Sequence, residues 1–246
     1  MNYKVIDSKF DKLLLNIKEH FSNEKNITLF QKRNTIKIVN FKDIDYVVKS
    51  FKIPHLLNQV VYNFFRDSKA KRSYENSIKL LALDINTPKP IGFIEFSTSL
   101  LFKNSYYVSE FFDYEFEIRA VFKDKEFENR EQILKEFTQF TYELHQKGVY
   151  HIDYSPGNIL VKKRDDSYLF YIIDVNRMQF LEFDIDLRMK SMAKLTSNAA
   201  DNALLLENYT GISKIEKNSL KEKQDLYLKK QKEYLENKKR LKKIKG

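Results

Sequence analysis

HIDYSPGNILV, residues 151–161, places Asp153 and Asn158 five positions apart in a segment that contains the dipeptide Pro156-Gly157 and then becomes apolar. Proline and glycine mark loops, and the apolar residues that follow are typical of a strand. The spacing H-x-D-x-x-x-x-N in a loop ahead of a strand is typical of the catalytic loop of phosphotransferases. The sequence therefore predicts such a loop here.

A second apolar run, Tyr171-Ile172-Ile173, ends in the carboxylate of Asp174. Phosphoryl transfer requires a base that orients the attacking hydroxyl and oxygen ligands that hold Mg²⁺ against the phosphates. We expect Asp153 to be the base, and Asn158 and Asp174 to bind the Mg²⁺ that accompanies ATP. We expect His151 to pack the loop structurally, because Asp153 already supplies the base.

A lysine far upstream completes the predicted site. Lys49 lies in the strand-like run Tyr46–Phe51, from which its ammonium would reach the phosphates of ATP. Such a lysine needs a carboxylate to hold it, and the segment between residues 52 and 83 offers only Asp67 and Glu75. We predict Glu75 as the partner, because it lies in the middle of a predicted helix, whereas Asp67 lies in the connection before it.

The order of the predicted elements matches an α+β, protein-kinase-like fold. We expect a β-rich N-lobe that covers the nucleotide (residues 1–108), a mainly helical C-lobe with the catalytic loop and metal site (109–213) and a Lys-rich helical tail (214–246). Gly148 is expected to end the longest helix of the C-lobe as a left-handed cap. The expected elements are helices over Lys9–Phe21, Leu56–Phe65, Ser68–Leu83 and Ile133–Leu144, a meander over Ile27–Lys52, strands over Ile91–Phe96 and Ser105–Phe111, and a hairpin of Ile159–Lys162 and Tyr168–Ile173.

The composition narrows the possible classes of protein. The chain has 246 residues, 42% of them hydrophobic, so it can bury a substantial core. Cysteine is absent, which excludes a disulfide framework, a thiolate metal site and a cysteine nucleophile. Charged residues interrupt the N-terminal region where a signal peptide needs an apolar core. The longest uncharged apolar-rich run, residues 53–65, is too short to span a bilayer, so we expect a cytoplasmic protein without a signal peptide or transmembrane segment.

Four stretches together resemble the bacterial lipopolysaccharide core kinases, the Kdo/heptose kinase family. They are Val48–Pro54, Phe64–Glu75, Thr87–Gly92 and His151–Leu160. The resemblance implies a protein-kinase-like fold that uses ATP and Mg²⁺ to phosphorylate a sugar, Kdo or heptose, of the lipopolysaccharide inner core. The acceptor would be linked to lipid A at the cytoplasmic face of the inner membrane. Carried over position by position, Lys49, Glu75, Asp153, Asn158 and Asp174 keep the roles given above.

The sequence departs from protein kinases at three places. No glycine precedes Gly92, so the Gly-rich loop is missing and the turn near residues 33–35 would have to cover the phosphates. Asp174 is followed by Val175-Asn176 instead of Phe-Gly. Ile152 occupies the position at which many protein kinases have an arginine that binds the phosphorylated activation loop. These differences favour a kinase of small substrates without activation-loop control.

The formal charge of +10 is concentrated at the C-terminus. Residues 1–213 carry a net charge of +2, whereas Lys214–Gly246 contains 13 basic and five acidic residues. Apolar residues recur there every seven positions, at Leu220, Tyr227, Tyr234 and Leu241. This period indicates a helix that either packs on the C-lobe, stays solvated or binds an anionic membrane surface. We do not expect nucleic acid as the partner, because aromatic and basic residues do not interleave as in a stacking platform.

A smaller basic cluster flanks the predicted helix Leu56–Phe65. That helix is apolar on one face and runs into Arg66, Lys71 and Arg72. It would pack on the N-lobe core or, as the alternative, lie in the headgroup region of an anionic membrane. Arg66, Lys71 and Arg72 are also candidate contacts for phosphates or carboxylates of the acceptor.

Other functions fit parts of this pattern. A catalytically silent kinase fold could bind nucleotide or anionic lipid as a scaffold, a kinase could act on another small molecule or a protein, and the basic tail could serve a nucleic-acid-associated protein. Lys49, Asp153, Asn158 and Asp174 together argue against a silent scaffold, because a scaffold needs neither a base nor two metal ligands. We therefore predict a sugar kinase of the lipopolysaccharide core.

Overall fold

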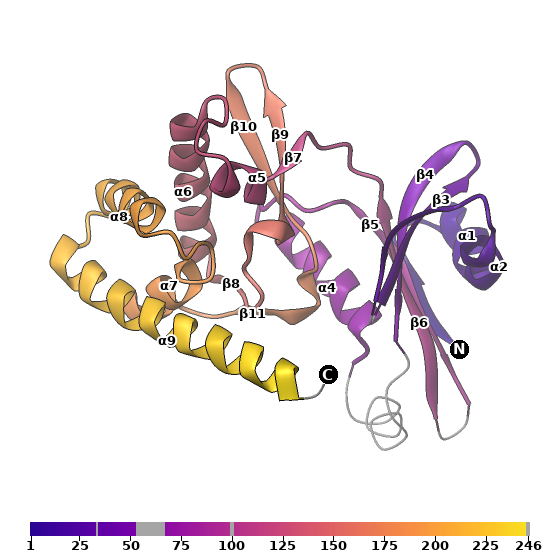
Figure 1. Ribbon diagram of the computed structural model, residues 1–246. Helices are drawn as coiled ribbons and strands as arrows, with labels where there is room; N and C mark the ends of the chain where they lie inside the picture. Colours follow the sequence, from indigo (N-terminus) through magenta and orange to yellow (C-terminus); the bar gives the residue numbers. More distant parts are fainter. Residues whose placement is uncertain (33, 53–66, 99–100, 245–246) are drawn as a thin grey trace. The chain divides into compact units, whose positions relative to one another are not determined.

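The computed structural model describes residues 1–32, 34–52, 67–98 and 101–244, and the chain forms two compact units (Figure 1). The first unit comprises Met1–Asp113 and Asp174–Arg177, and the second comprises Tyr114–Ile173 and the chain from Met178 onward. The predicted helix Leu56–Phe65 and Arg66 lie outside the described residues.

An antiparallel sheet of six strands forms the centre of the first unit. Its strands are β1 (Asn2–Val5), β2 (Ile27–Gln31), β3 (Asn34–Phe41), β4 (Ile44–Phe51), β5 (Pro90–Ser97) and β6 (Phe102–Glu110). Their spatial order is β1-β5-β6-β4-β3-β2. The predicted meander and the two later strands are confirmed. Strand β1 was not predicted, because its four residues are mostly exposed and show no alternation that burial would impose.

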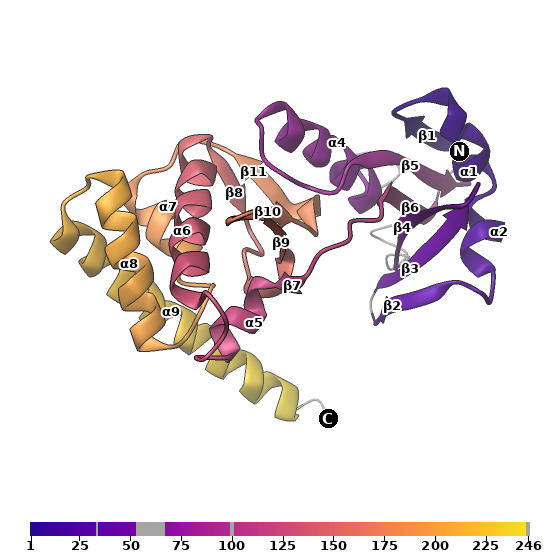
Figure 2. The same ribbon diagram turned by 90° about the horizontal axis from the view of Figure 1, so that it is seen from above.

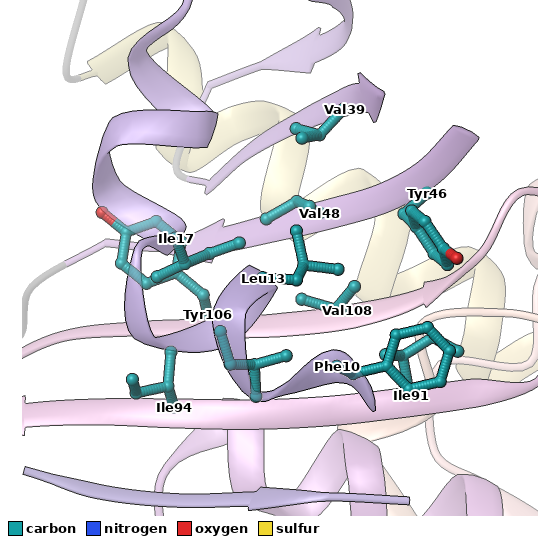
Figure 3. Close-up of a cluster of buried hydrophobic side chains, with 11 residues drawn as sticks. Phe10, Leu13, Ile17, Val39, Tyr46, Val48, Ile91, Ile94, Tyr106 and Val108 are labelled. Atoms are coloured by element: carbon teal, nitrogen blue, oxygen red, sulfur yellow. The ribbon is translucent and has the colours of Figure 1, made fainter. Parts of the chain in front are cut away.

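One face of this sheet is covered by a short N-terminal helical segment (Figure 3). It consists of a 3₁₀ turn (Ser8–Phe10), α1 (Asp11–Leu15) and α2 (Ile17–Ser22). Leu13 and Ile17 are buried against Val48 and Val108 of the sheet. The predicted single helix over Lys9–Phe21 is therefore interrupted at Asn16, whose backbone leaves the helical region and whose side-chain amide donates to the Lys12 carbonyl at 3.1 Å.

The other face of the sheet is covered by α4 (Lys69–Ala82), as predicted for residues 68–83. Ser68 is its N-cap and accepts a hydrogen bond from the Lys71 N–H at 3.1 Å. Ala70 and Tyr74 pack with Phe51 of β4 and Phe93 of β5. Side chains alternate along a strand, so Lys49 lies on the same face as Phe51 and points to the α4 side of the sheet, whereas Val48 points to the α1 side.

The second unit is built around α6 (Arg130–Gln146), whose apolar face is buried as predicted. Gly148 follows it at φ +68°, which confirms the predicted left-handed cap. A Cβ at this position would lie 2.8 Å from the carbonyl oxygen of Leu181, so close packing also requires glycine.

Short strands and four further α-helices complete the described part of this unit. The predicted hairpin is formed by β9 (Ile159–Arg164) and β10 (Ser167–Ile172), and Asp165 adopts a positive φ in its turn. The other elements are β7 (Phe116–Glu117), α5 (Ile118–Lys123), β8 (Val149–His151), β11 (Met178–Phe180), α7 (Ile185–Met192), α8 (Ala199–Ser213) and α9 (Lys217–Ile244). Seen from above, α7, α8 and α9 lie together on one side of α6 (Figure 2).

The basic tail forms the long helix α9. Leu220 and Gln224 are buried, and the Gln224 amide donates to the Asn202 carbonyl of α8 at 3.0 Å. The first half of α9 therefore packs on the second unit, while Tyr234 and Leu241 further along are 58% and 59% exposed. Within the described ranges, every helix falls short of the length or apolarity that crossing a bilayer demands.

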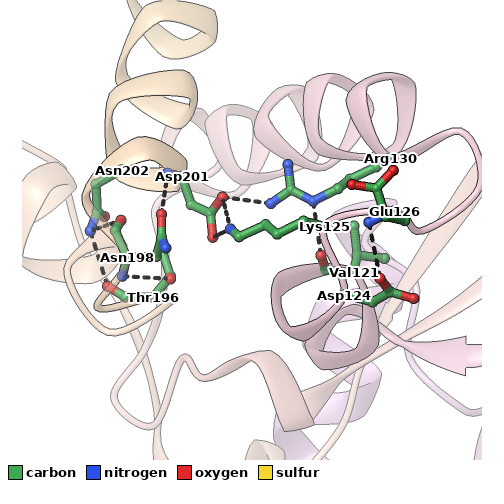
Figure 4. Close-up of polar contacts among 9 residues, drawn as sticks. All are labelled: Val121, Asp124, Lys125, Glu126, Arg130, Thr196, Asn198, Asp201 and Asn202. Atoms are coloured by element: carbon green, nitrogen blue, oxygen red, sulfur yellow. Dashed lines mark hydrogen bonds and ion pairs between the residues drawn. The ribbon is translucent and has the colours of Figure 1, made fainter.

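A buried cluster of charges joins α8 to the segment ahead of α6 (Figure 4). Asp201 is 2% exposed and accepts hydrogen bonds from Lys125 Nζ at 2.7 Å and from Arg130 Nη2 at 2.5 Å. Its backbone N–H donates to Oδ1 of Asn198, the N-cap of α8, at 3.1 Å. A carboxylate this buried depends on such partners, because it has lost its hydration.

Asp201→Asn is expected to lower the free energy of unfolding by about 2 kcal/mol, because it removes a buried carboxylate that accepts from Arg130 and from the half-exposed Lys125. Urea unfolding followed by circular dichroism measures the change. Asp225→Asn is the matched control, since Asp225 pairs with Lys221 at 3.2 Å on the exposed face of α9. It should change stability by less than about 0.5 kcal/mol. Equal effects of the two substitutions would contradict the stabilising role of the cluster.

Candidate active site

The predicted catalytic loop is closed by the imidazole of His151, which is buried at the end of β8. Its Nδ1 accepts a hydrogen bond from the Asp153 N–H at 3.0 Å, and its Nε2 lies 3.1 Å from the Ile173 carbonyl oxygen. A carbonyl can only accept and a backbone N–H can only donate, so the ring is neutral and carries its proton on Nε2. This geometry agrees with the structural role predicted for His151.

Hydrogen bonds of Asn158 hold the other end of the loop. Its side-chain Nδ2 donates to the Asp153 carbonyl at 2.9 Å, and its own carbonyl accepts from the Ile173 N–H at 3.0 Å. With Nδ2 committed to the loop, Oδ1 is the atom that the amide offers to a metal ion. Asp153 and Asn158 are thus brought together as predicted for a base and a metal ligand.

Tyr154 anchors this loop to the core of the second unit. Its hydroxyl shares a hydrogen bond of 2.8 Å with Thr141 of α6, and its ring stacks on Phe137. Burial raises the pKa of Tyr154 well above its ordinary value, so the hydroxyl stays protonated. Neighbouring Asp153 is therefore held by backbone that a buried aromatic residue fixes in place.

Lys49 and Asp174 form an ion pair within the first unit, a pairing that was not predicted. Lys49 is 8% exposed and its Nζ forms an ion pair with Asp174 Oδ1. Asn176 Nδ2 donates to the same carboxylate oxygen at 2.6 Å, and Asn76 of α4 donates to the Val175 carbonyl at 2.7 Å. The segment that carries Asp174 is therefore fixed from α4.

Asp174 has a left-handed backbone, with φ +58°. Residues other than glycine rarely adopt this conformation, although aspartate and asparagine tolerate it best. The two hydrogen bonds made by Asn76 and Asn176 hold the strained turn in place. The structure thus holds the Asp174 carboxylate against Lys49, and the role of Asp174 as a metal ligand stays a prediction.

The predicted pairing of Lys49 with Glu75 is wrong. Glu75 is half exposed, and its ion pair is with Lys71 at 3.9 Å. The face of α4 toward Lys49 carries Ser77 instead, whose hydroxyl lies 2.9 Å from that of Tyr107, the residue opposite Lys49 in the sheet. Glu75 is two positions from Ser77, about 200° around the helix, so its carboxylate lies on the far side.

The basic residues predicted to contact the acceptor are only partly described. Lys71 Nζ donates to Asp67 at 2.6 Å, and this hydrogen bond raises the pKa of Lys71. Arg72 is half-buried on α4. The Lys71 ammonium is thus held by acidic neighbours on its own segment.

Arg119 of α5 was not predicted and lies directly on the catalytic loop. A Cβ at Gly157 would fall 1.5 Å from Arg119 Nη2, so any other residue at this position would displace the guanidinium. Arg119 is 52% exposed and pairs with Glu117 at 3.5 Å. In the sequence, Gly157 is the residue that indicates such a contact, because a glycine in a loop allows another side chain to come close to the backbone. The local sequence pattern does not identify that side chain as Arg119.

The oxygen donors fit Mg²⁺. Asn158 supplies an amide oxygen and Asp174 a carboxylate, which are hard ligands of the kind that bind Mg²⁺ together with substrate phosphates and water. Within the described part of the chain, no three His, Cys, Asp or Glu side chains gather as a preformed metal cage. Asn158 in the second unit and Asp174 in the first each offer one such oxygen, and their joint role as metal ligands stays a prediction.

Comparison with known proteins identifies the relatives of this chain. The sequence model of the lipopolysaccharide kinase (Kdo/WaaP) family matches residues 21–230. A structure of WaaP in complex with acyl carrier protein is similar with a TM-score of 0.64 at 14% identity, over 93% of this chain and 99% of that one. A ternary complex of streptomycin, ATP and APH(2″)-IIa gives a TM-score of 0.48 at 12% identity, over 83% and 84%. No curated protein sequence matches.

The similarity to the WaaP structure confirms the predicted α+β, protein-kinase-like fold, and the family match confirms the predicted phosphotransferase class. Membership of a kinase family also implies the use of ATP. The family match covers most of the chain, including Lys49, Asp153, Asn158 and Asp174. The chain belongs to the lipopolysaccharide kinase (Kdo/WaaP) family.

Proposed function

We propose that this lipopolysaccharide-sugar kinase uses ATP and Mg²⁺ to phosphorylate Kdo or heptose of the inner core, on a lipid A linked acceptor at the cytoplasmic face of the inner membrane. The observation that carries the proposal is the loop from His151 to Asn158, in which a base and a metal ligand are held five residues apart by hydrogen bonds. A silent scaffold would not need this arrangement.

The chemistry follows from the residue types. Asp153 accepts the proton of the acceptor hydroxyl as its oxygen attacks the γ-phosphorus, and the bond to the bridging oxygen breaks to release ADP. Mg²⁺, when bound by Asn158 and Asp174, neutralises charge on the phosphates. Lys49 is buried with Asp174 as its ion-pair partner, so its ammonium is directed to the same phosphates.

The distal half of α9 is proposed to lie on the anionic membrane. Residues 229–245 carry nine basic and two acidic side chains, and Tyr234 and Leu241 expose an apolar seam between them. Each basic residue near such a surface contributes roughly 1 kcal/mol. Acyl carrier protein, the partner in the WaaP structure, is the other candidate for this surface.

Asp153→Asn is expected to lower kcat by a factor of about 100 to 10,000, because the amide cannot accept the proton. Acceptor-stimulated ADP release from core oligosaccharide measures the loss. Asp165→Asn is the matched control, since Asp165 lies in the β9–β10 turn at φ +53°, a conformation that asparagine also tolerates. Wild-type turnover in Asp153→Asn would refute the assignment of the base.

Asp174→Asn should preserve the left-handed backbone and remove the carboxylate. We expect kcat to fall by about 100-fold or more and the half-saturating Mg²⁺ concentration to rise, because a neutral amide holds the ion less tightly. Turnover measured across a Mg²⁺ titration tests this. An unchanged Mg²⁺ dependence would show that Asp174 is not a metal ligand.

Replacing Lys238 and Arg240 together by Glu should weaken sedimentation with phosphatidylglycerol vesicles by about 100-fold, because four units of charge are reversed near the surface. Neutral phosphatidylcholine vesicles should bind neither protein. Lys163 and Arg164, both exposed in the β9–β10 hairpin, supply the control with the same charge change. If wild-type protein sediments only with acyl carrier protein and not with vesicles, the membrane assignment fails.

A further inference from the structure

A pocket of about 590 Å³ lies in the second unit, between the segment that follows β11 and the tail helix α9. Its walls are formed by residues 181–187, by Lys190 of α7 and by Tyr227 of α9. Pockets of this volume are typical of small-ligand sites. We propose that this pocket binds a neutral, hydroxyl-rich sugar unit of the acceptor and that the tail helix supplies one wall. The inference rests on the proposed function and narrows the class of its substrate.

The pocket adjoins the catalytic loop through the backbone. Strand β11 pairs with β8 so that Met178 lies opposite His151 and Phe180 opposite Val149. The first pocket residue, Leu181, follows directly and donates its N–H to the Gly148 carbonyl at 2.9 Å. The polypeptide that enters the catalytic loop and the polypeptide that forms the pocket are therefore neighbours in one small sheet.

Side chains reinforce this connection at Tyr150. The ring of Phe183 in the pocket wall meets the Tyr150 ring edge-on at 6.0 Å. Lys194, one helical turn after Lys190, donates to the Tyr150 hydroxyl at 3.1 Å and to the Ile152 carbonyl at 2.8 Å. Burial raises the pKa of Tyr150. The positive charge of Lys190 lowers this pKa, and the negative charge of Asp153 raises it. Tyr150 thus connects the pocket wall at Phe183 with the backbone of the predicted catalytic loop at Ile152.

The chemistry of the walls suits a sugar that carries no acidic group. Glu182, Asp184 and Asp186 present carboxylate oxygens that accept hydrogen bonds from hydroxyls. These three negative charges face two cations, Lys190 in the wall and Lys223 beside Asp186, so the pocket keeps a negative excess. Tyr227 and Leu187 offer apolar surface for the carbon faces of a ring. An acidic sugar such as Kdo would meet repulsion, whereas a neutral heptose would not.

The tail helix is built into this pocket. Tyr227 donates its hydroxyl to Asp186 at 3.0 Å, and Lys223 Nζ lies 3.1 Å from the same carboxylate. These two bonds lower the pKa of Asp186, with the Lys223 bond first, so the group stays ionised. Because Leu220 and Gln224 anchor the preceding turns of α9, the wall at Tyr227 is fixed to the body of the unit.

Two substitutions test the pocket. Leu187→Trp fills it and is expected to raise the KM for a delipidated, heptose-terminated core oligosaccharide at least about tenfold, with the KM for ATP unchanged. Glu182→Lys should shift the ratio of KM values about tenfold in favour of a Kdo-terminated acceptor. The matched controls are Leu226→Trp, on the exposed side of α9, and Glu143→Lys, in the last turn of α6; both should leave these constants at wild-type values.

Binding measured without ATP separates this inference from the proposed function. Saturation-transfer NMR should detect the heptose-terminated oligosaccharide on wild type and lose it on Leu187→Trp. If core acceptors are turned over but Leu187→Trp changes neither KM nor the NMR signal, the pocket assignment is overturned and the kinase function stands. If wild type binds the oligosaccharide through this pocket yet never phosphorylates it, the pocket stands and the kinase function fails. Absence of both binding and turnover overturns both.

Discussion

The candidate site depends on the neutral imidazole of His151. The ring accepts from the Asp153 N–H and donates to the Ile173 carbonyl, so one buried group fixes both the catalytic loop and the strand end that precedes Asp174. The neutral ring is the form that makes both bonds, because a ring protonated on both nitrogens cannot accept from the Asp153 N–H. A single residue therefore holds both the loop that carries Asp153, the proposed base, and the strand end at Ile173.

The Lys49–Asp174 pair follows from a different constraint, the alternation of side chains in β4. Val48 belongs to the core under α1, so Lys49 must point to the opposite face, where α4 covers the sheet. Asn76 of α4 then holds the Val175 carbonyl, which places Asp174 in reach of the ammonium. Packing therefore determines an electrostatic contact between two residues that are 125 positions apart in the sequence.

The features that could be predicted from the sequence are those that depend on residues close together in the chain. The catalytic loop, the cap at Gly148 and the face of α6 follow from motif spacing and periodicity. Glu75 was assigned wrongly because the rotational phase of a helix against a sheet depends on which residues the sheet buries, here Ala70 and Tyr74. The Arg119–Gly157 contact and the pocket wall at Tyr227 bring distant segments together, and local pattern does not report such pairings.

The two halves of the tail helix α9 differ in their surroundings. Tyr227 closes the pocket, and Tyr234, seven residues later, is already exposed among basic side chains. At 1.5 Å per residue, about 10 Å of rigid helix separates these two positions. If the distal half rests on an anionic surface, the pocket is held at a fixed short distance above the headgroups. The charge of the tail and the chemistry of the pocket would then serve one lipid-linked acceptor.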